Sequence, residues 1–154
     1  MARLLILIGL DILVVVVCSV VVGVIAPRIP ASRLDSRTWP VPLMPWETVA
    51  FYRRIGVPWL TRMLPEAGAL FGGQSKSSLP GNAREAVQMY GREVRRAEWV
   101  HWLSSASALL VLLFNPWQLA VLFIGFVWIV NALFLAVLRN NRIRVDQILD
   151  RSGA

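Results

Sequence analysis

Three long runs of apolar residues divide the chain, and proline-rich or charged segments separate them. Residues 4–25 are almost uniformly apolar, and about 20 such residues let a helix cross the hydrocarbon core of a membrane. Pro27 and Pro30 then end the helix. The pattern predicts a transmembrane helix, with the Asp11 carboxylate facing other helices rather than lipid. A secretory signal peptide is the alternative, but the run exceeds the usual apolar core of about 7–15 residues.

The other two runs, residues 99–114 and 118–138, lie close together and are separated by an Asn-Pro pair at residues 115–116. Asn-Pro favours a turn, so we expect a helical hairpin. Helical spacing of apolar residues predicts an amphipathic helix over residues 82–114, capped by Asn82, which runs into the second span. The third run is long enough to cross fully, whereas the second is short, and a re-entrant hairpin therefore stays open.

The segment between the first run and the hairpin, residues 27–81, mixes prolines with tryptophans, tyrosine and arginines. The prolines forbid one long helix, while aromatic rings and arginines suit the headgroup layer of a membrane. We expect short interfacial helices over residues 46–55 and 58–64. Residues 71–79 are expected to form a flexible loop, without the spacing of a Walker loop.

Composition favours a membrane protein with a single domain of residues 1–154. Hydrophobic residues make up 56% of the chain and charged residues 16%, against about 45–50% and about 25% in soluble domains. The net charge of +7, together with the apolar runs, favours anionic lipid or a phosphorylated substrate over nucleic acid as a partner. A single cysteine, Cys18, leaves no internal disulfide and no cysteine metal site.

The distribution of basic residues predicts the orientation. Residues 27–97 carry eleven Lys and Arg, residues 139–154 carry four, and the hairpin tip at residues 115–117 carries none. Basic regions stay cytoplasmic. The sequence therefore predicts an all-α protein of the cell membrane with three transmembrane helices and a cytoplasmic interfacial helical region between the first and second. Its N-terminus lies outside, and its basic tail over residues 139–154 is cytoplasmic.

Candidate chemistry is concentrated in residues 93–102, where the polar helix enters the second apolar run. His101 is the only histidine, and Glu98 lies three residues before it on the same helical face. A histidine can act as a general base when a carboxylate on its other nitrogen fixes the tautomer. Nearby arginines can stabilise an oxyanion or hold the phosphates of coenzyme A.

Other interpretations of these residues stay open. Glu98 can instead form surface ion pairs with arginines, with His101 as a hydrogen-bonded anchor. A di-iron site needs two Glu-x-x-His motifs, and one histidine does not supply them, so no metal is expected. Ser104, Ser105 and Ser107 lack the Gly-x-Ser-x-Gly elbow of serine hydrolases and are expected to pack helix against helix.

Residues 84–150 resemble the glycosyl-4,4'-diaponeurosporenoate acyltransferases, small bacterial membrane proteins credited with the last step of staphyloxanthin synthesis. The order and spacing of polar residues across two apolar spans carry the resemblance. The matching residues are Glu93-x-x-Arg96-Ala97-Glu98-x-x-His101-Trp102, Phe114-Asn115, Asn131 and Arg139-x-Asn141-Arg142-x-Arg144-x-x-Gln147-x-Leu149.

This resemblance implies transfer of a fatty acyl group to a sugar hydroxyl of a glycosylated carotenoid or similar apolar glycolipid. The donor would be an acyl-CoA or an acyl carrier, with no further cofactor. The chemistry above makes His101 the base and Glu98 its orienting residue. The candidate substrate-binding residues are Glu93, Arg95, Arg96, Trp102, Asn131, Asn141, Arg142 and Arg144. A small non-catalytic subunit of a larger membrane enzyme or transporter is the competing hypothesis.

Overall fold

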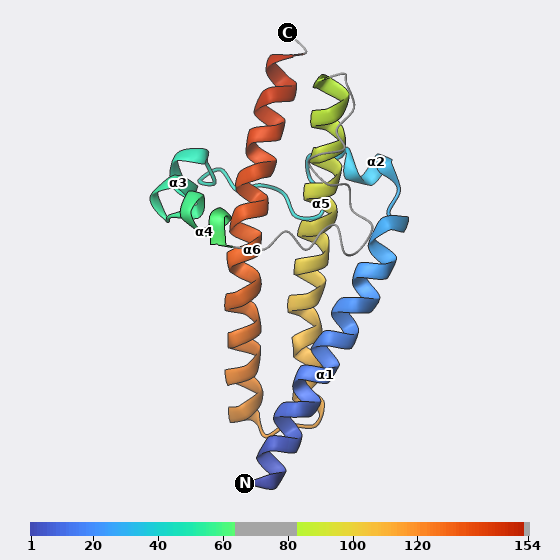
Figure 1. Cartoon of the computed structure of the whole chain (residues 1–154), viewed down its shortest axis with the longest axis vertical. Helices are drawn as coiled ribbons and strands as arrows, with labels where there is room; N and C mark the ends of the chain where they lie inside the picture. The colour runs from blue at the N-terminus through green and yellow to red at the C-terminus, as the bar shows by residue number, and fades with distance from the viewer. Residues whose placement is uncertain (64–82, 153–154) are drawn as a thin grey trace.

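Every regular element that the computed structural model describes, over residues 1–63 and 83–152, is a helix (Figure 1). The long elements are α1 (Ala2–Ile25), α5 (Ala83–Ser107) and α6 (Trp117–Arg151). The predicted all-α class is confirmed. The predictions for residues 71–79 and for the cap Asn82 lie outside the described residues.

The first apolar run forms α1, and a 3-10 turn, η1 (Ala26–Arg28), follows it. Pro27 lies in this turn, and the Arg28 guanidinium donates to the carbonyl of Val24 over 2.7 Å, which satisfies one carbonyl of the last turn. Asp11 is fully buried and accepts a hydrogen bond from the Asn115 side chain at the hairpin tip. Most large side chains of α1 stay exposed, and such a surface suits lipid better than water.

Within the described residues, two helices, not the three expected, are long and apolar enough to cross a membrane: residues 2–28 and α6. The predicted second span lacks a continuous apolar helix. Its amphipathic part forms α5, and the chain then tightens into the 3-10 helix η4 (Ala108–Leu113) before the Asn-Pro turn. The charged residues of α5 therefore share one helix with the apolar residues of the second run.

The third span continues far beyond its predicted end, since α6 runs unbroken from Trp117 to Arg151. No glycine or proline lies between residues 126 and 151, and arginine, leucine and glutamine are good helix formers. The predicted basic tail is therefore mostly the last turns of a helix, and its side chains Arg139 and Arg142 are buried.

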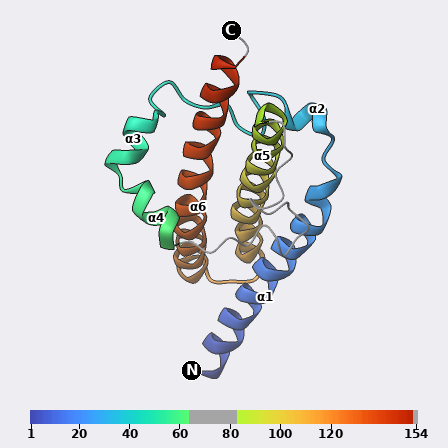
Figure 2. The same cartoon turned by 45° about the horizontal axis from the view of Figure 1, so that its top comes forward.

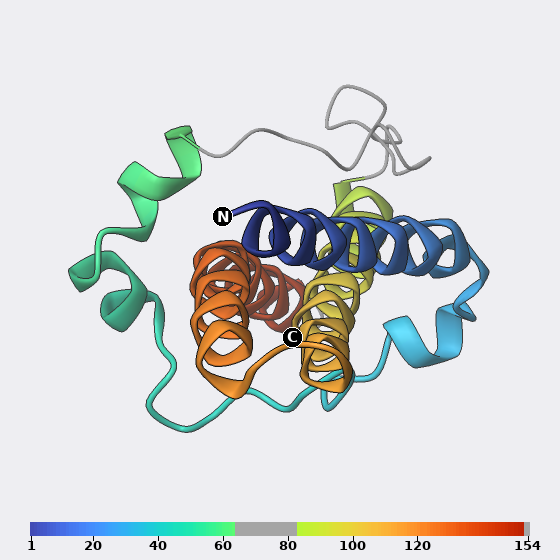
Figure 3. The ribbon, with the colours of Figure 1, turned by 90° about the horizontal axis from the view of Figure 1, so that it is seen from below.

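The described part of the proline-rich segment, residues 27–63, lies beside the polar ends of the two long helices α5 and α6 (Figure 2). It contains α2 (Ala31–Leu34), α3 (Val49–Arg54) and α4 (Val57–Met63), and Gly56, with a φ of +82°, makes the turn between α3 and α4. Figure 2 shows α3 and α4 beside α6, on the side away from α5. The segment joining α2 to α3 passes over the face of α5 and α6 opposite α1 (Figure 3).

Apolar contacts hold α3 and α4 in this position. Tyr52 and Val57 are buried against Ile143 of α6, and partly buried neighbours surround them. Thr48 caps α3 by accepting a hydrogen bond from the backbone N–H of Phe51 over 3.1 Å. These contacts place the residues just before α3 directly over the junction of α5 and α6.

Candidate active site at the junction of two long helices

A buried ionic network joins α5 to α6. The Glu98 side chain is completely buried, and its two oxygens accept hydrogen bonds from Arg139 Nη1 over 2.6 Å and from Arg142 Nη1 over 2.9 Å. The two arginines lie three positions apart on α6, so they share a helical face. A buried carboxylate is tolerated only when it is paired and hydrogen-bonded, and this arrangement meets both conditions.

Arg139 extends the network to the segment before α3. Its Nε donates to Glu47 over 2.6 Å, and the Tyr52 hydroxyl and the Met44 backbone N–H also donate to this carboxylate. Burial raises the pKa of Glu47, but the hydrogen bonds from Arg139, Met44 and Tyr52 outweigh it and lower this pKa to about 2. Glu47 therefore stays ionised at neutral pH.

Arg142 fastens the proline-rich segment to the helices. Its guanidinium donates to the carbonyl of Val41 over 2.9 Å and to that of Arg37, while Arg139 donates to the carbonyl of Pro42 over 2.9 Å. Backbone carbonyls in a stretch without regular structure are satisfied in this way. The Arg142 side chain is fully buried in these contacts. It therefore has no exposed surface for contact with the acyl donor, which was the role predicted for it from the sequence.

The expected pairing of Glu98 with His101 does not form, because both Glu98 oxygens bind arginines of α6. His101 contacts α6 at a different level. Its Nδ1 lies 2.8 Å from Asn131 Oδ1. Its ring stacks on Phe134, also of α6, with ring centroids 4.8 Å apart and ring planes at 12°. Asn131, rather than Glu98, thus occupies the orienting position beside His101.

The contacts of Asn131 fix the tautomer of His101. Asn131 Nδ2 donates to the carbonyl of Val127 over 2.9 Å, so its Oδ1 is the end that faces the ring. An amide oxygen only accepts, and a neutral imidazole has one donor and one acceptor nitrogen. The proton therefore lies on Nδ1, and Nε2, for which the described residues supply no hydrogen-bond partner, keeps its lone pair.

The serines after His101 serve the helix packing. Ser104 accepts a hydrogen bond from Ser19 of α1 over 3.1 Å, and Ser105 donates to the carbonyl of His101 over 2.8 Å. The backbone carbonyl of Ser105 in turn accepts a hydrogen bond from the indole N–H of Trp128 over 2.9 Å. These contacts link all three long helices around the level of His101.

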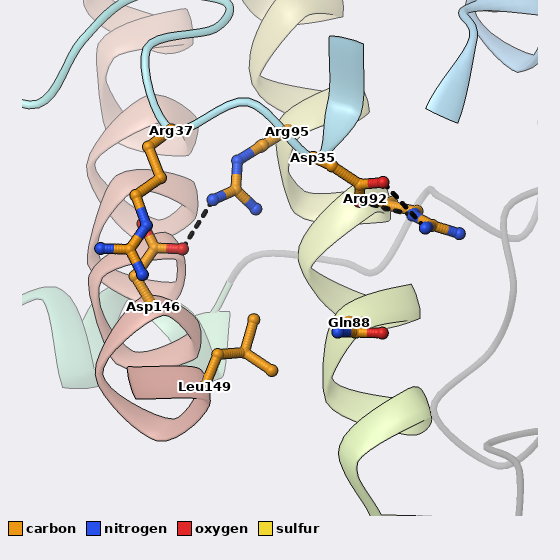
Figure 4. Close-up of a pocket in the computed structure, with 7 residues that line it drawn as sticks. All are labelled: Asp35, Arg37, Gln88, Arg92, Arg95, Asp146 and Leu149. Atoms are coloured by element: carbon orange, nitrogen blue, oxygen red, sulfur yellow. Dashed lines mark hydrogen bonds and ion pairs between the residues drawn. The ribbon is translucent and has the colours of Figure 1, made fainter. Parts of the chain in front are cut away.

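A pocket of about 350 Å³ lies at the other end of the network, between α5, α6 and the segment after α2 (Figure 4). Arg95 lines it and pairs with Asp146 of α6 over 2.6 Å. Gly91 allows the close approach, since a Cβ there would lie 2.8 Å from Val145 Cγ1. Of the predicted donor-binding arginines, only Arg95 lines this pocket.

The remaining predicted residues are dispersed. Arg96 pairs with Glu93 within α5, Arg144 and Trp102 are exposed, and Asn141 is half-buried on α6. Among the described residues, no group of three His, Cys, Asp or Glu side chains is placed to hold a metal ion.

The sequence did not single out Glu47, Tyr52 or Phe134. The available signal was that Glu47 is the single carboxylate of residues 39–63, which are rich in proline and tryptophan. Such a residue needs a cationic partner when the stretch is buried. Nothing in the spacing of the sequence indicated Phe134.

Comparison with known proteins gives one match. A family model described as glycosyl-4,4'-diaponeurosporenoate acyltransferase matches residues 30–151, which include the ionic network, the His101–Asn131 pair and the pocket. No curated protein and no solved structure matches the chain. The match covers most of the chain and confirms the resemblance noted from its polar motifs. The chain therefore belongs to the glycosyl-4,4'-diaponeurosporenoate acyltransferase family.

Proposed function

We propose that the protein is an integral membrane O-acyltransferase that esterifies a sugar hydroxyl of a glycosylated carotenoid, or of a similar apolar glycolipid, with a fatty acyl group. The family description supports the reaction type, and two helices of membrane-spanning length support the location. The observation that carries the catalytic part is the contact between His101 and Asn131, because it leaves Nε2 as a base.

In the proposed reaction, His101 Nε2 accepts the proton of the sugar hydroxyl while the hydroxyl oxygen attacks the carbonyl carbon of an acyl thioester. The new C–O ester bond forms, the C–S bond breaks, and the imidazolium returns the proton to the departing thiolate. Asn131 accepts the Nδ1–H throughout, as the asparagine of a Cys-His-Asn triad does. Phe134 restricts the tilt of the ring.

In the proposed mechanism Glu98 has a structural role and is not hydrogen-bonded to His101. Together with Arg139, Arg142 and Glu47 it holds the proline-rich segment against α5 and α6. Breaking a buried ion pair by removing one partner costs about 3–5 kcal/mol. A Glu98→Gln variant should therefore lose stability together with activity, whereas a His101 variant should lose activity alone.

Expression in a bacterial host that accumulates a glycosylated carotenoid tests the reaction. Mass spectrometry of lipid extracts should reveal the glycoside with one hydroxyl hydrogen replaced by a fatty acyl group, a mass gain of one fatty acid less one water. His101→Ala should lower this conversion about 100-fold or more. Val100→Ala, a half-buried neighbour on the same helix, is the matched control and should stay near wild type.

An unchanged glycoside in cells that contain the folded wild-type protein would contradict acyl transfer. Co-purification of a stoichiometric membrane enzyme in that case would favour the non-catalytic subunit. Ester formation that His101→Ala leaves intact would keep the acyltransferase and remove the proposed base.

A further inference from the structure

The pocket at the polar ends of α5 and α6 has no part in the proposed proton transfer. Its volume of about 350 Å³ lies within the range of small-molecule sites. In Figure 4, α6 contributes Asp146 on one side and α5 contributes Arg92 and Arg95 on the other. Arg37 completes the wall from the segment after α2. Three guanidinium groups thus line a cavity large enough for a ligand.

Arg95 is the fixed cation of this pocket. Its side chain is 5% exposed, and Asp146 and the carbonyl of Gly91 accept hydrogen bonds from its two terminal nitrogens. Its Nε–H has no acceptor within the described part of the chain. A buried guanidinium with an unused donor sustains a positive potential that favours an anion nearby.

Arg37 and Arg92 are paired more loosely. Arg37 pairs with Asp150, with side-chain exposures of 63% and 55%, and Arg92 pairs with Asp35, with exposures of 39% and 50%. Exposed ion pairs contribute only about 0–1 kcal/mol. A phosphate can therefore replace these carboxylates at small cost, and it offers guanidinium groups more charge and a matching fork of oxygens.

We propose that this pocket binds the phosphate of a phosphopantetheine-bearing acyl donor, the chemical group that acyl-CoA and acyl carrier protein share. The inference rests on the proposed acyl transfer, which needs a thioester donor. Arg95 and His101 both contact α6 and lie six residues apart on α5, a rise of roughly 9 Å. An extended pantetheine arm is longer than this rise, so a donor held at the pocket can bring its thioester to His101.

Calorimetry on the purified chain in phosphatidylcholine nanodiscs tests the proposal, with CoA as the first probe and holo acyl carrier protein, against the apo form, as the second. We expect at least one of them to bind and inorganic phosphate to compete. CoA binding identifies a free thioester donor, and binding of the holo carrier alone identifies a carrier-bound donor. Arg37→Gln and Arg92→Gln should each weaken binding about 10-fold or more.

Arg54→Gln, which removes an exposed arginine of α3 away from the pocket, is the matched control and should bind as wild type does. Failure of the wild type to bind either probe would overturn the proposal. Binding by Arg37→Gln and Arg92→Gln that is as tight as binding by the wild type would also overturn it. These measurements contain no acyl acceptor. Ester formation in cells without binding at the pocket therefore rejects this inference alone, and binding without ester formation rejects the proposed function alone.

Discussion

The side chains of His101 and Asn131 form a pair in which the amide fixes both the position of the ring and the place of its proton. The amide is itself held, because Asn131 donates to a carbonyl one turn back in α6. In the proposed reaction, a base held in this way is oriented before substrate binds, which would reduce the reorganisation needed in the transition state.

Substitutions of Asn131 distinguish a role in orienting the His101 ring from a role in binding substrate. Asn131→Leu removes the acceptor of the Nδ1–H, so kcat should fall about 10-fold or more with KM nearly unchanged. Asn131→Asp keeps an acceptor oxygen and should recover much of the loss. Steady-state kinetics on both variants checks this. Equal kcat values for Asn131→Leu and wild type would mean that the contact is only structural.

Glu98 illustrates how far residue spacing could predict the site. The spacing of three from His101 correctly indicates neighbouring positions on α5, but it contains no information about the facing helix. Arg139 and Arg142 of α6 compete for the carboxylate and bind it, because two charge-assisted hydrogen bonds are stronger than one to a neutral imidazole. The catalytic role of His101 stays a prediction, and its partner Asn131 follows from the packing of α6.

Ionised Glu47 should make the stability of the folded protein depend on pH in the acidic range. Its pKa in the folded protein is about 2, below the ordinary value of 4.5, so its contribution is complete above pH 4.5 and is lost as the pH falls towards 2. Tm measured in detergent should decrease through this window. Glu47→Gln should lower Tm at pH 7 and reduce the acid dependence, while the exposed control Glu85→Gln should change neither.

At the scale of elements, most helix positions follow from the apolar pattern, and the errors occur at their ends. Residues 139–154 were predicted to be a basic tail, because charged residues usually mark the end of a membrane span. Residues 139–151 instead continue α6, because each inward-facing arginine has a carboxylate or carbonyl partner. The partner Glu47 lies 92 residues away from Arg139 in the chain, so no local window of sequence contains this information.

Close packing of α5 against α6 depends on Gly91. A methyl group there would lie 2.8 Å from Val145 Cγ1 and 3.2 Å from Arg95 Nη1, and Val145 is buried. Gly91→Ala should therefore destabilise the protein by about 1–3 kcal/mol. Gly125→Ala is the matched control, because nothing lies within 4 Å of the added Cβ. Thermal unfolding of both variants checks this, and equal Tm values would contradict the close contact.

At the scale of the whole molecule, α1 and α6 run in the same direction along the long axis (Figure 1). If both cross the membrane, the chain must return between them, and α5 with η4 is the segment that does so. The hydropathy of this segment falls short of a spanning helix because the charged turns of α5 belong to the same element. We propose on this basis, and from the distribution of arginines, an outside N-terminus and a cytoplasmic C-terminus.

Cysteine labelling tests that orientation. In a Cys18→Ala background, a membrane-impermeant maleimide should label Gln118→Cys, in the first turn of α6 next to the hairpin tip, on intact cells. It should label Gln147→Cys, on the exposed face of the last turns of α6, only after lysis. Labelling of the second variant on intact cells, with the first protected, would reverse the proposed topology.

The most direct measurement is the initial rate of ester formation by the purified protein in nanodiscs, supplied with a glycosylated carotenoid and a fatty acyl thioester. Wild type should complete many turnovers, and folded His101→Ala, verified by a cooperative thermal transition, should be slower by about 100-fold or more. Equal rates for the two proteins would contradict the assignment of His101 as the base.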